Sequence, residues 1–168
     1  MSNPEIEQVA RETFGFETLR PGQREAIGSL LEGRDTLVVM STGSGKSAIY
    51  EIAGFIKPGV TVVISPLAAP RRDPVEDYLF LAPEQLADDE VLAQVRAADP
   101  TLIVIDEAHC ISERVPDFRP DYLRLGAFIA EMGHPPVLAL TTATAPPVRE
   151  QIVDKLHLHD PVVVAPPA

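Results

Sequence analysis

Short apolar runs alternate along the chain with segments whose apolar residues recur at helical spacing. The runs predict strands at 36–40, 60–65, 78–81, 102–105, 137–141 and 162–164. The intervening patterns predict helices at 22–31, 46–56, 88–97, 121–132 and 147–156. This alternation is typical of an α/β domain with a mainly parallel sheet and helices on both faces. We therefore expect one domain over residues 1–168, with ligands bound at the carboxyl ends of the strands.

A glycine-rich loop follows the first apolar run and leads into a predicted helix. Its glycines allow successive backbone N–H groups to converge at the positive end of that helix, where they would bind phosphate. Lys46 would add a charge for the β- and γ-phosphates, and the Ser47 hydroxyl would ligate Mg²⁺. Met40 stands where the phosphate-loop pattern begins with glycine, at a position that ends the strand. The candidate nucleotide-binding residues of the loop are Thr42, Gly43, Ser44, Gly45, Lys46 and Ser47.

A second apolar strand, in the segment "TLIVIDEAHC", ends in two acids. A carboxylate at the end of a strand can hold Mg²⁺ through water, which we assign to Asp106. Glu107 could orient or deprotonate the water that attacks the γ-phosphate, and His109 could relay to a nearby loop. Alone, the two acids could equally form a solvent-facing acidic turn, and His109 would more often be a structural histidine. Together with Lys46 it predicts one Mg²⁺-nucleotide site.

Length and composition fit one globular domain: 168 residues, 45% hydrophobic and 23% charged. No apolar run approaches the roughly 20 residues of a membrane span, and the acidic start is unlike a signal peptide, so we expect a cytoplasmic protein. The single cysteine, Cys110, excludes an intramolecular disulfide and is expected to be a small buried residue. The remaining histidines lie in turn-like or terminal segments: His134, His157 and His159. The "HLH" segment is too short a signal for a metal site and is read as surface.

The net charge of −11 argues against an extended nucleic-acid surface, because such surfaces usually carry a basic face. Any contact with DNA must therefore be local. The basic residues that could make it, each of which could equally be a solvated surface charge, are Arg71, Arg72, Arg114, Arg119 and Arg124.

Several motifs together resemble one family. "RPGQ", "MSTGSGKS", "VVISPLAA", "LAPEQL", "DEAHCIS", "DFRPDYLRL" and "LALTTATAPP" occur in the order found in RecQ-type DNA helicases. Over nearly its whole length the chain resembles the first of the two RecA-like motor lobes of that family. "DEAHCIS" preceded by "RPGQ" and followed by "DFRP" is highly specific to it.

The resemblance implies an ATP- and Mg²⁺-dependent DNA helicase of 3′–5′ polarity that acts in DNA repair and recombination and needs a second RecA-like lobe. Within residues 14–27, Gln23 would read adenine, with Arg20 assisting and Phe16 stacking on the base. Thr142, with Thr144, would couple hydrolysis to strand movement, and Thr141 is the alternative because "LTTATAP" departs from the usual run. The candidate contacts to single-stranded or partly duplex DNA are Ser65, Pro66, Arg114, Phe118, Arg119 and Thr142.

Two further departures change what is expected of this chain. The family carries a Trp and a His between "IS" and "DFRP", where residues 113–116 read "ERVP". The segment 66–81 is also shorter than in the family, which removes part of the DNA track. We expect the isolated chain to bind ATP weakly, to hydrolyse it very slowly and not to unwind DNA. A small-substrate phosphotransferase and a non-catalytic nucleotide-binding or regulatory module are the alternatives.

Overall fold

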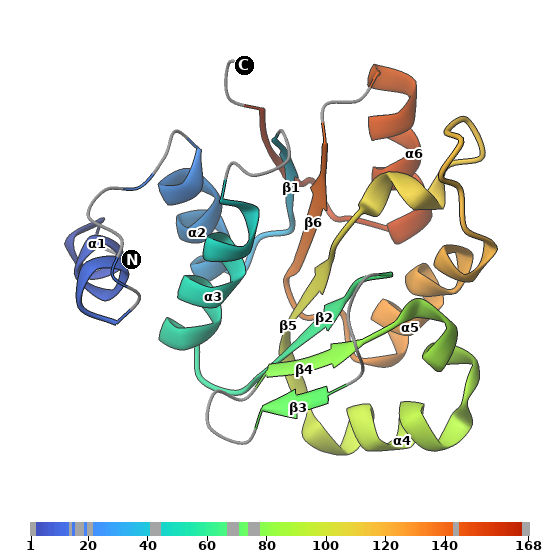
Figure 1. Cartoon of the computed structure of the whole chain (residues 1–168), viewed down its shortest axis with the longest axis horizontal. Helices are drawn as coiled ribbons and strands as arrows, with labels where there is room; N and C mark the ends of the chain where they lie inside the picture. Colours follow the sequence, from blue (N-terminus) through green and yellow to red (C-terminus); the bar gives the residue numbers. More distant parts are fainter. Residues whose placement is uncertain are drawn as a thin grey trace.

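The computed structural model describes residues 3–13, 15, 19, 22–40, 45–66, 71–73, 78–142 and 145–165 of the chain. The strands are β1 Thr36–Val39, β2 Val60–Ile64, β3 Arg71–Asp73, β4 Tyr78–Leu81, β5 Pro100–Ile105, β6 Val137–Thr141 and β7 Val162–Val164. They form one sheet in the order β3-β4-β2-β5-β6-β1-β7 (Figure 1). Neighbouring strands are parallel except for β3 and β4, which pair antiparallel. The expected α/β domain with a mainly parallel sheet is confirmed.

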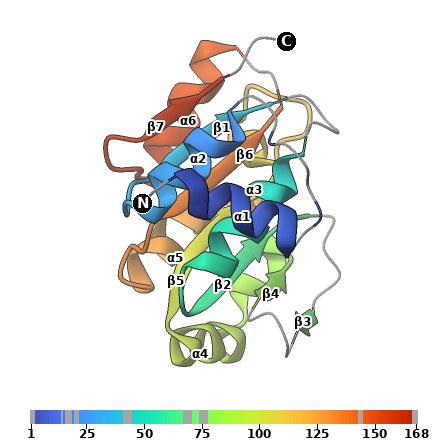
Figure 2. The same ribbon diagram turned by 90° about the vertical axis from the view of Figure 1, so that its left-hand side faces the viewer.

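Helices cover both faces of this sheet. The α-helices are α1 Asn3–Glu12, α2 Gln23–Leu31, α3 Lys46–Ile56, α4 Asp89–Ala98, α5 Leu125–Glu131 and α6 Pro146–Leu156, and the 3₁₀-helices are η1 Pro83–Ala87, η2 Ala108–Ile111 and η3 Pro120–Arg124. Helices α1, α2 and α3 lie on one face, in front of the sheet in Figure 2, and α5 and α6 lie on the other. In the described part of the chain, no helix is long and apolar enough to cross a membrane.

Strand β1 shows why the apolar runs predicted the strands so well. Along β1 and Met40, which follows it, the side chains alternate between two core clusters: Leu37 and Val39 pack with α5 and α6, whereas Val38 and Met40 pack with α1, α2 and α3. A strand covered on both faces needs apolar residues at every position. The structure therefore reproduces the six predicted strands to within two residues at each end.

Three differences from the expected elements have local causes. Helix α1 and strand β3 were not expected, because α1 precedes the first strong apolar pattern and β3 consists of Arg-Arg-Asp at the edge of the sheet. The helix expected over 121–132 begins instead with the 3₁₀-helix η3, led by Pro120, and continues as α5. Cys110 is buried, as expected.

Strand register brings the predicted site residues to one edge. Ile64 pairs with Ile105, and Ile105 with Ala139, so β2, β5 and β6 end at the same edge of the sheet. Met40 continues β1 and its N–H donates to the carbonyl of Thr141. The carboxyl ends of β1 and β5 therefore lie at this same edge of the sheet, with β6 between them.

Candidate functional site

The phosphate loop meets helix α3 at a residue that requires glycine. Gly45, which precedes the helix, has φ 86° and ψ 30°, in the left-handed region that residues with a Cβ rarely adopt. Lys46 follows as the first residue of α3, where the helix dipole adds to its positive charge. Within this loop, residues 41–44, including Thr42, Gly43 and Ser44, lie outside the described residues, as does the side chain of Ser47.

Asp106 lies immediately after β5 and is held at that edge by its backbone and its side chain. Its N–H donates to the carbonyl of Ile64 at 2.8 Å, and its carboxylate accepts the N–H of Glu107 at 2.9 Å and the hydroxyl of Ser65. Burial raises the pKa of Asp106, and the charge of Glu107 raises it further. The positive charge of Lys46 lowers the pKa of Asp106, so the two side chains interact electrostatically.

Glu107 and His109 form a chain of contacts toward β6. Glu107 adopts a left-handed conformation, with φ 53°, which starts the turn of η2. The His109 imidazole, itself buried, lies with Nε2 3.3 Å from the Glu107 carboxylate and Nδ1 2.8 Å from the hydroxyl of Thr141. The histidine therefore connects the acidic turn to the end of β6. Thr141, rather than Thr142, makes this contact.

Tyr122 holds the acidic turn in place through a hydrogen bond, a role that the sequence did not suggest. The side chain is fully buried, and its hydroxyl donates to the Asp106 carbonyl at 2.8 Å. Burial raises the pKa of Tyr122 far above its usual range, so this donor keeps its proton. The tyrosine lies in η3, within the "DFRPDY" segment that follows the acidic turn.

A cavity of about 470 Å³ opens beside Glu107 and His109. Three residues expected to contact DNA, Pro66, Phe118 and Arg119, line it together with these two. Arg114 is exposed nearby, and Thr142 is half-buried at the end of β6. Ser65 is buried, and its hydroxyl faces Asp106. Contact of any of these residues with DNA stays a prediction.

The residue expected to read adenine touches the phosphate loop. Gln23 is the first residue of α2 and is buried, and its side-chain amide donates to the Gly45 carbonyl at 2.8 Å. The segments expected to bind base and phosphate are therefore in direct contact. Phe16, Arg20 and Thr144 lie outside the described residues.

His134 differs in exposure from the two histidines of "HLH". His157 and His159 are exposed, as expected. His134 is not, because its side chain is only 19% exposed and its Nε2 lies 2.9 Å from the buried carboxylate of Asp35. Nothing near His134 in the sequence indicates this partner, which precedes it by 99 positions.

Comparisons with known proteins agree with this arrangement. A family model described as DEAD/DEAH box helicase matches residues 20–78. The "Probable ATP-dependent DNA helicase RecS" of Bacillus subtilis is 33% identical over 189 residues, which cover 94% of this chain and 38% of RecS. The "ATP-dependent DNA helicase RecQ" of Pasteurella multocida is 32% identical over 188 residues, covering 92% of this chain and 30% of that protein. Over more than nine-tenths of its length the chain is thus similar to part of RecQ-family DNA helicases.

The chain spans well under half the length of the curated relatives it matches. Its alignment with RecS is longer than the whole chain, so RecS carries residues that have no counterpart here. Among solved structures, a hypothetical ATP-dependent RNA helicase from Sulfolobus tokodaii matches with a TM-score of 0.69 at 21% identity, covering 98% of this chain and 57% of that one. The Hef helicase domain of Pyrococcus furiosus matches with a TM-score of 0.60 at 17% identity, over 88% of this chain and 38% of that one. Both show the helicase fold.

Proposed function

We propose that this chain is the Mg²⁺-ATP-binding motor lobe of a cytoplasmic RecQ-like DNA helicase with 3′–5′ polarity that acts in DNA repair and recombination. The observation that supports it best is the electrostatic interaction of Lys46 with Asp106, next to the Glu107–His109 pair. A cation for phosphate, a carboxylate for metal and a possible base for water thus lie at one edge of the sheet.

Each residue in the site has a role that its surroundings support. The start of α3 and Lys46 would bind the phosphates. Asp106 and Ser47 would hold Mg²⁺, which prefers hard oxygen ligands and would supply charge neutralisation at the phosphates when bound. Glu107 would orient and deprotonate the attacking water, and His109 would fix Glu107 through its 3.3 Å contact.

The motor would be incomplete without a second RecA-like lobe. Phosphoryl transfer depends on charge supplied around the phosphates, and an arginine from across the cleft accounts for about 10³–10⁵ in rate. In the family that arginine belongs to the second lobe. We therefore propose that this lobe alone binds ATP, hydrolyses it very slowly and does not unwind DNA.

Nucleotide binding tests this proposal with a matched pair of lysine variants. Lys46→Ala should weaken binding of a fluorescent ATP analogue in the presence of Mg²⁺ by at least about tenfold. Lys57→Ala is the control, because Lys57 ends the same helix α3 at the opposite end from the site. Equal affinity of the wild type and Lys46→Ala would overturn the assignment of the phosphate site.

The second candidate is a non-catalytic nucleotide-binding or regulatory module derived from such a lobe. The net charge of −11 and the loop 113–116, which lacks the family's aromatic side chains, favour it. ATP hydrolysis measured with an added second lobe, with and without single-stranded DNA, separates the two. Stimulation by DNA supports the motor, and nucleotide binding with no stimulation supports the module.

A further inference from the structure

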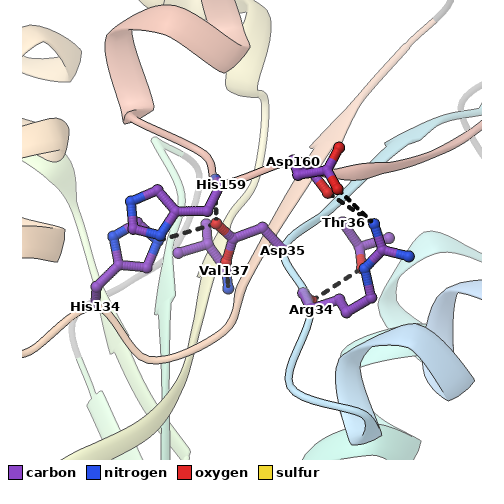
Figure 3. Close-up of polar contacts among 7 residues, drawn as sticks. All are labelled: Arg34, Asp35, Thr36, His134, Val137, His159 and Asp160. Carbon is purple, nitrogen blue, oxygen red and sulfur yellow. Dashed lines mark hydrogen bonds and ion pairs between the residues drawn. The ribbon is translucent and has the colours of Figure 1, made fainter.

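Three side chains far apart in the sequence meet at the opposite edge of the sheet from the nucleotide site. Asp35 immediately precedes β1, His134 lies three residues before β6, and His159 lies three residues before β7. The sheet order β6-β1-β7 makes these three strands neighbours. Figure 3 shows the two imidazoles lying one above the other, with Asp35 beside them.

Asp35 presents a fixed carboxylate to this cluster. It is buried, with 4% of its surface exposed. Its Oδ1 accepts the N–H of Val137 at 3.0 Å, and its Oδ2 accepts the backbone N–H of His159 at 2.7 Å. Oδ2 also lies 2.9 Å from Nε2 of His134. One backbone donor from β6 and one from the segment before β7 therefore orient the carboxylate, in the way that hydrogen bonds orient metal-ligating groups.

The imidazole rings of His134 and His159 are stacked on each other. Their rings stack with centroids 3.9 Å apart and an interplanar angle of 11°. His134 is held at its position by a left-handed backbone, with φ 50°. Across the described residues, His159 has this ring contact and its backbone hydrogen bond, but its imidazole makes no hydrogen bond. One nitrogen of each ring and one oxygen of Asp35 all lie within 4.8 Å of one another.

We propose that Asp35, His134 and His159 form a binding site for a divalent transition metal of the Zn²⁺ type. Two imidazole nitrogens and one carboxylate oxygen are a ligand set that Zn²⁺ accepts, with water in the fourth position. Ligand atoms of a tetrahedral Zn²⁺ site lie about 3.4 Å apart, given bonds of about 2.0–2.1 Å. The ligand atoms here lie within 4.8 Å of one another. Because the lone pair of an imidazole nitrogen lies in the ring plane, binding would require the exposed His159 ring to turn out of its stack with His134.

The site has an open path to solvent. His159 also lines a cavity of about 610 Å³ beside α6 and β7, so a metal ion and its bound water can enter from that side. A bound ion would join the starts of β1, β6 and β7 through side chains from three separate parts of the chain. Such an ion would bind the folded state preferentially and stabilise it. The alternative is a hydrogen-bonded Asp–His clamp that binds no metal.

Titration of Zn²⁺ into the chain, prepared without an affinity tag, tests the site. Calorimetry measures the binding, and thermal unfolding measures the change in Tm. We expect one Zn²⁺ per chain and, at about 100 times the Kd, a rise in Tm of about 5–10 °C. His159→Gln should weaken Zn²⁺ binding at least about tenfold, while the backbone N–H that bonds Asp35 is kept. His134→Asn should do the same, because asparagine tolerates the left-handed backbone at that position.

His157→Asn is the matched control. His157 is another exposed histidine at a left-handed position, two residues from His159 and outside the cluster. The His157→Asn substitution should leave Zn²⁺ binding unchanged. Mg²⁺ should give no rise in Tm at this site, since the imidazoles suit transition metals. Co²⁺ should give the visible absorption of a tetrahedral complex in the wild type and lose it in His159→Gln.

Two results would overturn the proposal. One is Zn²⁺ binding to His159→Gln that is as tight as in the wild type, which would leave the hydrogen-bonded clamp. The other is loss of binding in His157→Asn, which would place the ion elsewhere. His159→Gln keeps the test decisive if His134→Asn fails to fold, because the His159 side chain is exposed.

Discussion

The half-buried carboxylate of Asp106 is placed where its proposed function costs the folded chain stability. The raised pKa means that its surroundings, taken together, disfavour the ionised form, although Lys46, Ser65 and the N–H of Glu107 all favour it. A folded protein that must keep this group ionised at neutral pH loses stability by doing so. A bound cation would remove that cost, which is a reason to find such a carboxylate at a metal site.

Asp106→Asn should therefore stabilise the chain while abolishing Mg²⁺-dependent nucleotide binding. The amide oxygen can still accept from Glu107 and Ser65, but the buried charge is gone. We expect a gain of about 1 kcal/mol at pH 7, or about 2–4 °C in Tm, measured by thermal unfolding without nucleotide.

The pH dependence of that gain checks its cause. A carboxyl group whose pKa is raised on folding costs stability above the folded pKa, and this cost disappears as pH falls through that value. The difference in Tm between Asp106→Asn and the wild type should therefore shrink as the pH is lowered toward 4. A difference that stays constant with pH would mean that packing, and not charge, is responsible.

Cys110 should be an unreactive thiol. Burial, with the negative charge of Glu107, raises the pKa of Cys110 to about 11. Because the thiolate is the reactive form, alkylation of the folded chain at pH 8 should be about 100-fold slower than that of an ordinary thiol. The rate, followed by mass spectrometry, should keep rising with pH beyond 9. A rate that levels off near pH 9 would show that the thiol is not desolvated.

At the level of elements, the contact between α5 and α6 depends on one glycine. A Cβ added at Gly126 in α5 would lie 2.4 Å from the backbone carbonyl of Lys155 in α6, and backbone cannot yield as a side chain can. Gly126→Ala should destabilise the chain by about 1–3 kcal/mol, measured by urea unfolding. Gly28→Ala in α2 is the control, because a Cβ there meets nothing within 4 Å and should stabilise the chain by about 0.5–1 kcal/mol. Equal effects at both positions would contradict the close approach of α5 and α6.

The strands that could be predicted from the sequence are those whose burial on both faces requires apolar residues at successive positions. Strand β1 has a continuous apolar run because it is covered on both faces, and the run marks its position directly. Strand β3 has no such pattern, because Arg-Arg-Asp at the edge of the sheet contains no apolar residue. Its pairing with β4 depends on the path of the chain, which local patterns do not describe.

The same contrast applies to the candidate sites: some contacts follow from local sequence pattern, and others depend on how the elements pack. The neighbourhood of Lys46 and Asp106 could be predicted because each follows a parallel strand, and such strands end at a common edge. The contact of Gln23 with Gly45 could not, since it depends on how α2 packs against α3. The cluster of Asp35, His134 and His159 could not either, because only the strand order β6-β1-β7 brings its residues together. A motif search detects residues close in sequence, and these are separated by up to 124 positions.

At the scale of the whole molecule, the proposed DNA contact of this acidic chain would be confined to a small region. Phe118 and Arg119 line the cavity beside Glu107 and His109. The adjoining loop 113–116 is anchored by Val115, which packs against the core, whereas Arg114 is exposed. RecQ-type helicases carry aromatic side chains in this loop. Because residues 113–116 have none, the affinity of this chain for single-stranded DNA should be limited by the lack of a surface on which bases can stack.

Arg114→Trp should therefore tighten binding of single-stranded DNA, measured by fluorescence anisotropy at fixed salt. Stacking of one base on an aromatic side chain contributes about 1–3 kcal/mol, which corresponds to a roughly 5- to 150-fold gain in affinity. The lost arginine charge opposes this gain and should also make binding less dependent on salt. Ala97→Trp, on the exposed side of α4, controls for the mere addition of an indole. If both variants bind DNA equally, or if Arg114→Trp binds more weakly than the wild type, the loop is not part of the DNA track, and the regulatory module becomes the better account of this chain.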